Sequence, residues 1–146
     1  MTDGAISSVL LADGHERFCR GLARAISACS RLWLTATVRD GALAAAVIER
    51  DQPDLALLDV RLPLLDGYEI ATFLSAQQSR PRTRVILITA LLDSAAITRA
   101  TRAGAIGCLG KDASRAEICE ALLAAADGVA WAADDPVKGI VLAVGN

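Results

Sequence analysis

Four polar side chains end or closely follow short apolar runs in this sequence, and together their types could do chemistry. Asp13 ends the run VLLA, Asp59 ends LALL, Thr89 ends VILI, and Lys111 follows CLG. Lys111 is one of only two lysines in the chain, the other being Lys138. A lone aspartate after such a run is best explained as a helix N-cap. Four such groups at the ends of successive runs indicate a binding site instead.

The chemistry open to these side chains is that of metal ions and phosphoryl groups. Two carboxylates can hold a hard cation such as Mg2+, together with water and phosphate oxygens. A carboxylate is already ionised at neutral pH, so it can act as a nucleophile without a general base and become an aspartyl phosphate. An amine and a hydroxyl would then hold the phosphoryl oxygens. The residue types therefore allow a metal site and a phosphoryl acceptor at one place.

The elements that must position these groups alternate along the chain. Apolar runs predict strands that are buried on both faces, and they lie at 9–12, 32–38, 55–58, 85–88 and 106–109. Between the runs, apolar residues recur at helical spacing, as in Phe18, Leu22 and Ile26. The alternation predicts a (βα)5 chain with an open parallel sheet and helices on both faces. Ligands of such sheets bind at the carboxyl ends of the strands.

Capping signals mark where the helices begin. Asp66 with Glu69 and Ser114 with Glu117 both fit a capping box, because each polar residue is followed three positions later by an acid. Asp40 is an N-cap candidate, and so is Asp93. These signals place a helix start after four of the five predicted strands.

Composition narrows the class of protein. The chain has 146 residues, 53% of them hydrophobic, and a net charge of −2, which fits one globular domain without a nucleic-acid footprint. The four cysteines form no metal-binding spacing, and the only histidine, His15, is expected to be exposed. No apolar run approaches bilayer length, and the first residues lack a signal-peptide pattern. We therefore expect a cytoplasmic protein that contacts neither membrane nor nucleic acid.

The sequence around these side chains resembles a known family. LLDVRLPLLDGYE surrounds Asp59, RVILITA surrounds Thr89, and RAGAIGCLGKDAS surrounds Lys111. From about residue 7 to about residue 129, the chain resembles the receiver domain of bacterial two-component response regulators, most of all the LuxR-type (NarL/FixJ) subfamily. The resemblance implies a flavodoxin-like (CheY-like), doubly wound (βα)5 fold with a parallel five-stranded sheet of order 2-1-3-4-5.

The resemblance also implies roles for individual residues. A sensor histidine kinase would phosphorylate Asp59 in a phosphorelay that controls transcription. Asp13, Asp59 and the backbone carbonyl of Arg61 would hold Mg2+. Thr89 would follow the phosphoryl group on activation, and Lys111 would pair with it.

Three residues depart from the family pattern, and one of them, Gly110, replaces a larger residue next to Lys111. Gly14 stands where the family has a second acid that touches the metal, so we expect weakened Mg2+ binding. Glu16 is a weaker candidate for that ligand position, because an acid in a first helical turn also suits the helix dipole. Cys108 stands where the family has a switch aromatic that reports phosphorylation. These departures leave open an alternative, in which the domain is a phosphorylation-independent interaction or dimerisation module.

An enzyme on the same fold is not favoured. A haloacid-dehalogenase-type phosphatase would need an aspartate where Arg61 stands, and a P-loop or flavodoxin-like site would need a glycine- or hydroxyl-rich loop where ADGHERF stands. At most, autodephosphorylation is expected.

The sequence divides into a receiver domain at 1–130 and a C-terminal tail at 131–146. In the family, a linker helix leads from this point to a helix-turn-helix domain. Ile140, Val141 and Val144 resemble the start of that helix, so DNA would be contacted by a missing C-terminal domain. A homodimer is expected on activation.

Overall fold

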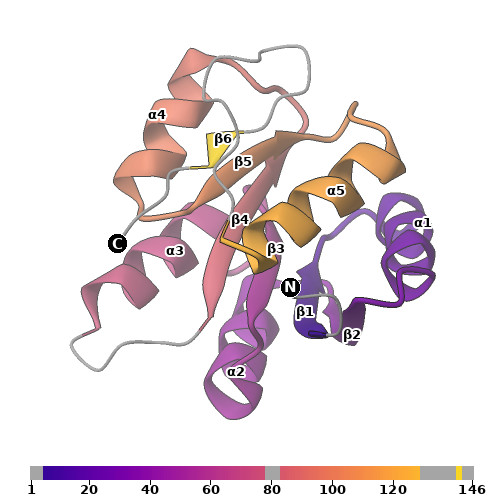
Figure 1. Ribbon diagram of the computed structural model, residues 1–146. Coiled ribbons are helices and arrows are strands. Elements are labelled where there is room, and N and C mark those ends of the chain that lie inside the picture. The colour runs from indigo at the N-terminus through magenta and orange to yellow at the C-terminus, as the bar shows by residue number, and fades with distance from the viewer. Residues whose placement is uncertain (1–4, 78–82, 129–140, 143–146) are drawn as a thin grey trace.

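The computed structural model describes residues 5–77, 83–128 and 141–142. Its centre is a parallel sheet whose strands run in the order β2-β1-β3-β4-β5, as predicted (Figure 1). The parallel strands are β1 (Ser7–Ala12), β2 (Leu32–Val38), β3 (Leu55–Asp59), β4 (Arg84–Thr89) and β5 (Gly107–Gly110). The fold class expected from the sequence is confirmed.

Helices cover both faces of the sheet (Figure 1). They are α1 (Glu16–Ser27), α2 (Gly41–Asp51), α3 (Gly67–Ala76), α4 (Ser94–Arg102) and α5 (Arg115–Ala126). Successive residues of a strand point to opposite faces, so Val9 packs with α1 and α5 while Leu10 packs with α2, α3 and α4. Both residues are fully buried, which explains why the strands read as continuous apolar runs.

The predicted caps start the helices. Asp40 accepts a hydrogen bond from the Leu43 backbone N–H at 2.8 Å, and Asp93 caps α4 in the same way. Both predicted capping boxes, at the starts of α3 and α5, are closed by reciprocal hydrogen bonds. The starts of α2, α3, α4 and α5 are therefore fixed locally, by groups that satisfy otherwise unpaired backbone N–H donors.

The sheet has a further strand that the sequence did not predict. β6 (Val141–Leu142) pairs antiparallel with β5, opposite Gly107 and Cys108 (Figure 1). The expectation of a linker helix through Val141 is wrong at these two residues, because their backbone hydrogen-bonds to the free edge of β5. Ile140, Val144 and the rest of the tail lie outside the described residues. Within the described ranges, no helix is both long and apolar enough to cross a bilayer.

Candidate functional site at the carboxyl ends of the strands

The strand ends bring three of the four predicted groups into direct contact. Asp59 is the last residue of β3, Asp13 directly follows β1, and Lys111 directly follows β5. The Lys111 ammonium nitrogen Nζ lies 2.9 Å from Asp59 Oδ2 and 2.8 Å from Asp13 Oδ2. Thr89 ends β4 beside them, and its carbonyl accepts the Lys111 backbone N–H at 2.8 Å. The convergence expected of parallel strands is confirmed.

Each aspartate turns one carboxylate oxygen away from the ammonium. Asp13 Oδ1 accepts the backbone N–H of His15 at 2.7 Å, and Asp59 Oδ1 accepts that of Arg61 at 3.0 Å. These turns fix both side chains, which are 0% and 3% exposed. The second oxygen of each carboxylate faces Lys111, so the site holds two buried anions pointed at one cation.

Glycine allows the backbone of α3 to approach this site. A side chain at Gly67 would place its Cβ 2.7 Å from the backbone carbonyl oxygen of Asp59. Only glycine therefore lets the first turn of α3 pack directly behind the end of β3. This contact sets the position of the loop that follows Asp59.

Lys111 is held by charge on one side and by an aromatic ring on the other. Its ammonium lies 4.7 Å from the centre of the Phe18 ring, a cation–π contact from α1. Burial alone would lower the pKa of Lys111, but the carboxylates of Asp13 and Asp59 outweigh burial and raise it. The lysine is therefore a permanent positive charge at neutral pH.

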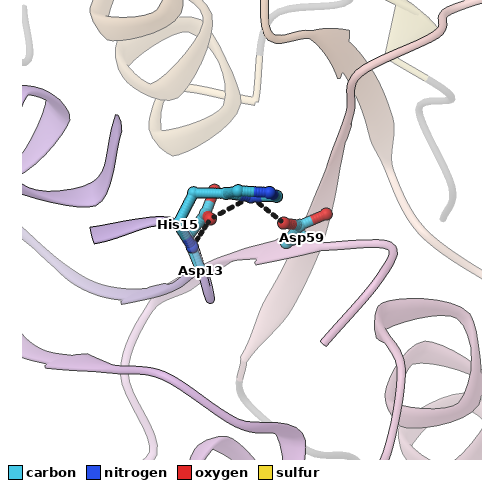
Figure 2. A group of neighbouring side chains, drawn as sticks. All are labelled: Asp13, His15 and Asp59. Atoms are coloured by element: carbon cyan, nitrogen blue, oxygen red, sulfur yellow. Dashed lines mark hydrogen bonds and ion pairs between the residues drawn. The ribbon is translucent and has the colours of Figure 1, made fainter. Parts of the chain in front are cut away.

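His15 also belongs to this cluster, and the sequence assigned it no role. Figure 2 shows its imidazole between the carboxylates of Asp13 and Asp59, with Nδ1 3.4 Å from Asp13 Oδ1 and 3.7 Å from Asp59 Oδ2. The side chain is exposed, as expected, but Nδ1 also lies 3.1 Å from Lys111 Nζ. The His15 backbone N–H donates to the Asp13 carboxylate, and this short turn places the His15 side chain at the pocket. An aspartate followed two residues later by a histidine was the only sign of this in the sequence.

Gly14 leaves room for a side chain. A Cβ there would lie 3.6 Å from the Arg39 carbonyl oxygen and 3.7 Å from Pro63 Cδ, which are ordinary contacts. Glu16 does not reach the pocket, because its carboxylate pairs with Arg20 and with Arg39 on the surface. The carboxylate that the family places here is not supplied by Glu16.

Thr89 is turned toward its own loop. Its hydroxyl exchanges hydrogen bonds with the backbone of Leu91, at 3.3 Å each, and the side chain is buried. Within the described residues, no hydrogen bond joins this hydroxyl to Asp59. A surface pocket lined in part by Tyr68, Thr89 and Arg99 opens beside it, with Arg99 stacked 4.1 Å over the Tyr68 ring.

Cys108, in place of the family's aromatic, is a core residue. It is 1% exposed, and it belongs to the same apolar cluster as Tyr68. Burial, with a smaller effect of Asp93, raises the pKa of the thiol to about 11. The thiol is therefore neutral near pH 7 and is not a nucleophile.

The donors of this cluster fit a hard divalent cation. Asp13 Oδ2 is buried and is paired with the Lys111 ammonium at 2.8 Å. Ligand atoms from Asp13, His15 and Asp59 all lie within 4.8 Å of one another. A cation entering here would meet the carboxylate oxygens that now pair with Lys111, so it would take the place of the ammonium.

Known proteins with the same organisation identify the family. The response regulator receiver domain family matches residues 9–123. The chain is 36% identical over 132 residues to the probable transcriptional regulatory protein NarL of Mycobacterium tuberculosis, covering 90% of this chain and 60% of that protein. It is 31% identical over 120 residues to the transcriptional regulatory protein LnrK of Bacillus subtilis, covering 82% of this chain and 54% of LnrK.

Solved structures agree. The signal receiver domain of the M. tuberculosis NarL superposes with a TM-score of 0.80 at 36% identity, over 85% of this chain and 98% of that one. A LuxR-family two-component response regulator from Aurantimonas shares the fold, with a TM-score of 0.81 at 24% identity over 92% and 95% of the two chains. The chain spans about 60% of the first of these curated relatives. It belongs to the response regulator receiver domain family, in its LuxR-type (NarL) branch.

Proposed function

We propose that this domain is a phosphoryl-accepting signalling switch whose acceptor is Asp59. The observation that carries the proposal is the Asp59 Oδ2 carboxylate oxygen, fixed at the end of β3 and 2.9 Å from the Lys111 ammonium. The other oxygen is tied to the Arg61 backbone N–H, so Oδ2 is the oxygen that attacks phosphorus. A P–O bond forms as the P–N bond to a donor histidine breaks.

Lys111 then changes partner. The ammonium that pairs with both carboxylates lies beside the oxygen that receives the phosphoryl group. It compensates the added negative charge by pairing with a phosphoryl oxygen. Thr89, one strand away, leaves the backbone of Leu91 and donates its hydroxyl hydrogen to the same group.

Asp13, Asp59 and the backbone carbonyl of Arg61 would hold the Mg2+ ion. When bound, the ion supplies positive charge that offsets the charge gathered on the transferred group. The buried pairing of Asp13 Oδ2 and Asp59 Oδ2 with one cation, Lys111, supports this assignment. Gly14 adds no ligand, so Mg2+ binding is expected to be weaker than with a second acid.

The proposal extends to partners through the relatives. The matched relatives are named transcriptional regulatory proteins, and a fold neighbour is titled a DNA-binding response regulator of the LuxR family. We infer a sensor histidine kinase as phosphodonor, homodimerisation on activation, and DNA binding through a further C-terminal domain that begins after a linker at 131–146.

The domain itself contacts neither DNA nor membrane and works in the bacterial cytoplasm. It is a phosphoryl-accepting signalling domain rather than a classical enzyme, with at most autodephosphorylation as an activity of its own. The comparisons give no support to the phosphorylation-independent alternative.

Labelling from a small acyl phosphate tests the acceptor without the kinase. Wild type should incorporate phosphate when Mg2+ is present and should incorporate none when a chelator removes the ion. Asp59→Asn should incorporate none in either condition. Asp51→Asn is the matched control, because Asp51 is an exposed residue at the end of α2 that pairs with Arg50. Equal labelling of wild type and Asp59→Asn would overturn the assignment.

A further inference from the structure

The cluster contains one possible metal ligand, the imidazole of His15, that neither the family pattern nor the proposed function uses. His15 Nδ1 lies 3.1 Å from Lys111 Nζ, and the two carboxylate oxygens on that ammonium lie at 2.8 and 2.9 Å. Two of these ligand atoms come from the loop between β1 and α1 and one from the end of β3, and all three surround one positive charge. The ammonium stands where a metal ion would be coordinated.

His15 meets Lys111 through Nδ1, a ring nitrogen that can bind a metal ion. The Nδ1 distances to Asp13 and Asp59 are 3.4 and 3.7 Å, longer than hydrogen bonds. Nδ1 therefore makes no hydrogen bond to either carboxylate that a metal ion would have to break.

The spacing of the donors suits coordination. Adjacent ligands on an octahedral ion with bonds of about 2.1 Å lie about 3 Å apart. His15 Nδ1 lies 3.4 Å from Asp13 Oδ1 and 3.7 Å from Asp59 Oδ2, close to that spacing, and one ligand atom from each of the three residues lies within 4.8 Å of the others. Asp13 Oδ2 is buried and lies 2.8 Å from Lys111 Nζ, beside these atoms (Figure 2 shows the three residues).

We propose that His15 is a metal ligand in this receiver domain and occupies the coordination position that Gly14 leaves open. Two carboxylates and one imidazole form a site with nitrogen in its donor set and one negative charge fewer than three carboxylates. Mg2+ takes oxygen ligands, whereas first-row transition ions accept imidazole nitrogen as well. The site therefore prefers a divalent transition ion such as Mn2+ over Mg2+. The inference rests on the proposed function only for the location of the metal.

The His15 side chain can be removed without harm to the fold. It precedes α1 at the N-cap position, but its side chain makes no capping hydrogen bond. Its exposed ring has no place in either apolar core cluster. An effect of His15→Ala on metal affinity would therefore reflect lost coordination and not unfolding.

Titration calorimetry of the unphosphorylated domain with Mn2+ and with Mg2+ tests the inference. His15→Ala should weaken Mn2+ binding by about tenfold and Mg2+ binding by less than about twofold, so that the preference for Mn2+ disappears. Arg17→Ala is the control, since Arg17 is an exposed neighbour outside the cluster, and it should preserve the preference.

Asp13→Asn separates this inference from the proposed function. If Asp13→Asn weakens binding of both ions but His15→Ala leaves the Mn2+ preference intact, His15 is not a ligand and only the inference fails. If Asp13→Asn changes the affinity for neither ion, the metal is not held at this pocket, and the metal site of the proposed function fails with it.

Discussion

Removing the charge of Lys111 should lower the free energy of unfolding of the domain, and a bound metal ion should restore most of that loss. In Lys111→Met the side chain keeps its length and its apolar stem beside Phe18, but the ammonium is lost. Asp13 and Asp59 are then left as two buried carboxylates, 0% and 3% exposed, without the cation that lies 2.8 and 2.9 Å away. Breaking a buried ion pair by removing one partner costs about 3–5 kcal/mol. Since the Lys111 side chain is 13% exposed, we expect a loss near the lower end, about 3 kcal/mol.

A divalent cation takes the place of the ammonium in this variant. At a Mg2+ concentration about 100 times the dissociation constant, binding adds about 2.7 kcal/mol to the free energy of unfolding. Wild type should gain less, because the ion must first displace Lys111 from the carboxylates.

Urea denaturation followed by circular dichroism, with and without Mg2+, measures both effects. Arg20→Ala is the control, since it removes an exposed arginine that pairs with Glu16, and it should change stability by less than about 0.5 kcal/mol. A loss in Lys111→Met no larger than in the control, or a loss that Mg2+ does not reduce, would refute the account of the site.

Three further perturbations follow from the structure. Gly14→Asp should bind Mg2+ about tenfold more tightly, as measured by calorimetry, because the added carboxylate supplies an oxygen ligand. The substitution fits, since a Cβ at this position meets no atom closer than 3.6 Å. Unchanged affinity would mean that Mg2+ is not bound next to this position. Between pH 9 and 11 the folded state keeps the Cys108 proton that the unfolded chain loses, so the free energy of unfolding should fall as pH rises. The fall should be up to about 3 kcal/mol larger than in Cys108→Ala. Parallel curves of stability against pH for the two proteins would contradict this. Leu64→Gly should raise the free energy of unfolding by about 1 kcal/mol, because Leu64 is 78% exposed at φ 73°, a conformation that glycine adopts without strain; a lower denaturation midpoint would be the wrong sign.

The groups that end the parallel strands could be predicted from the sequence. Asp59 and Thr89 end strands buried on both faces, and such strands must align their carboxyl ends. The capping boxes of α3 and α5 were also predictable, because both partners lie within one turn. These features follow from short-range chemistry combined with the rules of an open parallel sheet.

Other features depend on contacts between distant parts of the chain. His15 meets Lys111 across 96 positions, and a side-chain contact of that kind leaves no periodic signal. β6 has two residues, too few for an alternating pattern, and only the free edge of β5 makes it a strand. The hydroxyl of Thr89 turns to Leu91, a choice set by the conformation of the loop rather than by residue type.

A structure of the domain with Mg2+ and a fluoroberyllate mimic of the phosphoryl group tests the central claim most directly. The account predicts the mimic on Asp59 Oδ2, the metal in contact with Asp13 and Asp59, and Lys111 paired with the mimic. A mimic bound at another residue, or a pocket in which Lys111 still pairs with both carboxylates at saturating mimic and Mg2+, would contradict the assignment of Asp59 as the phosphoryl acceptor.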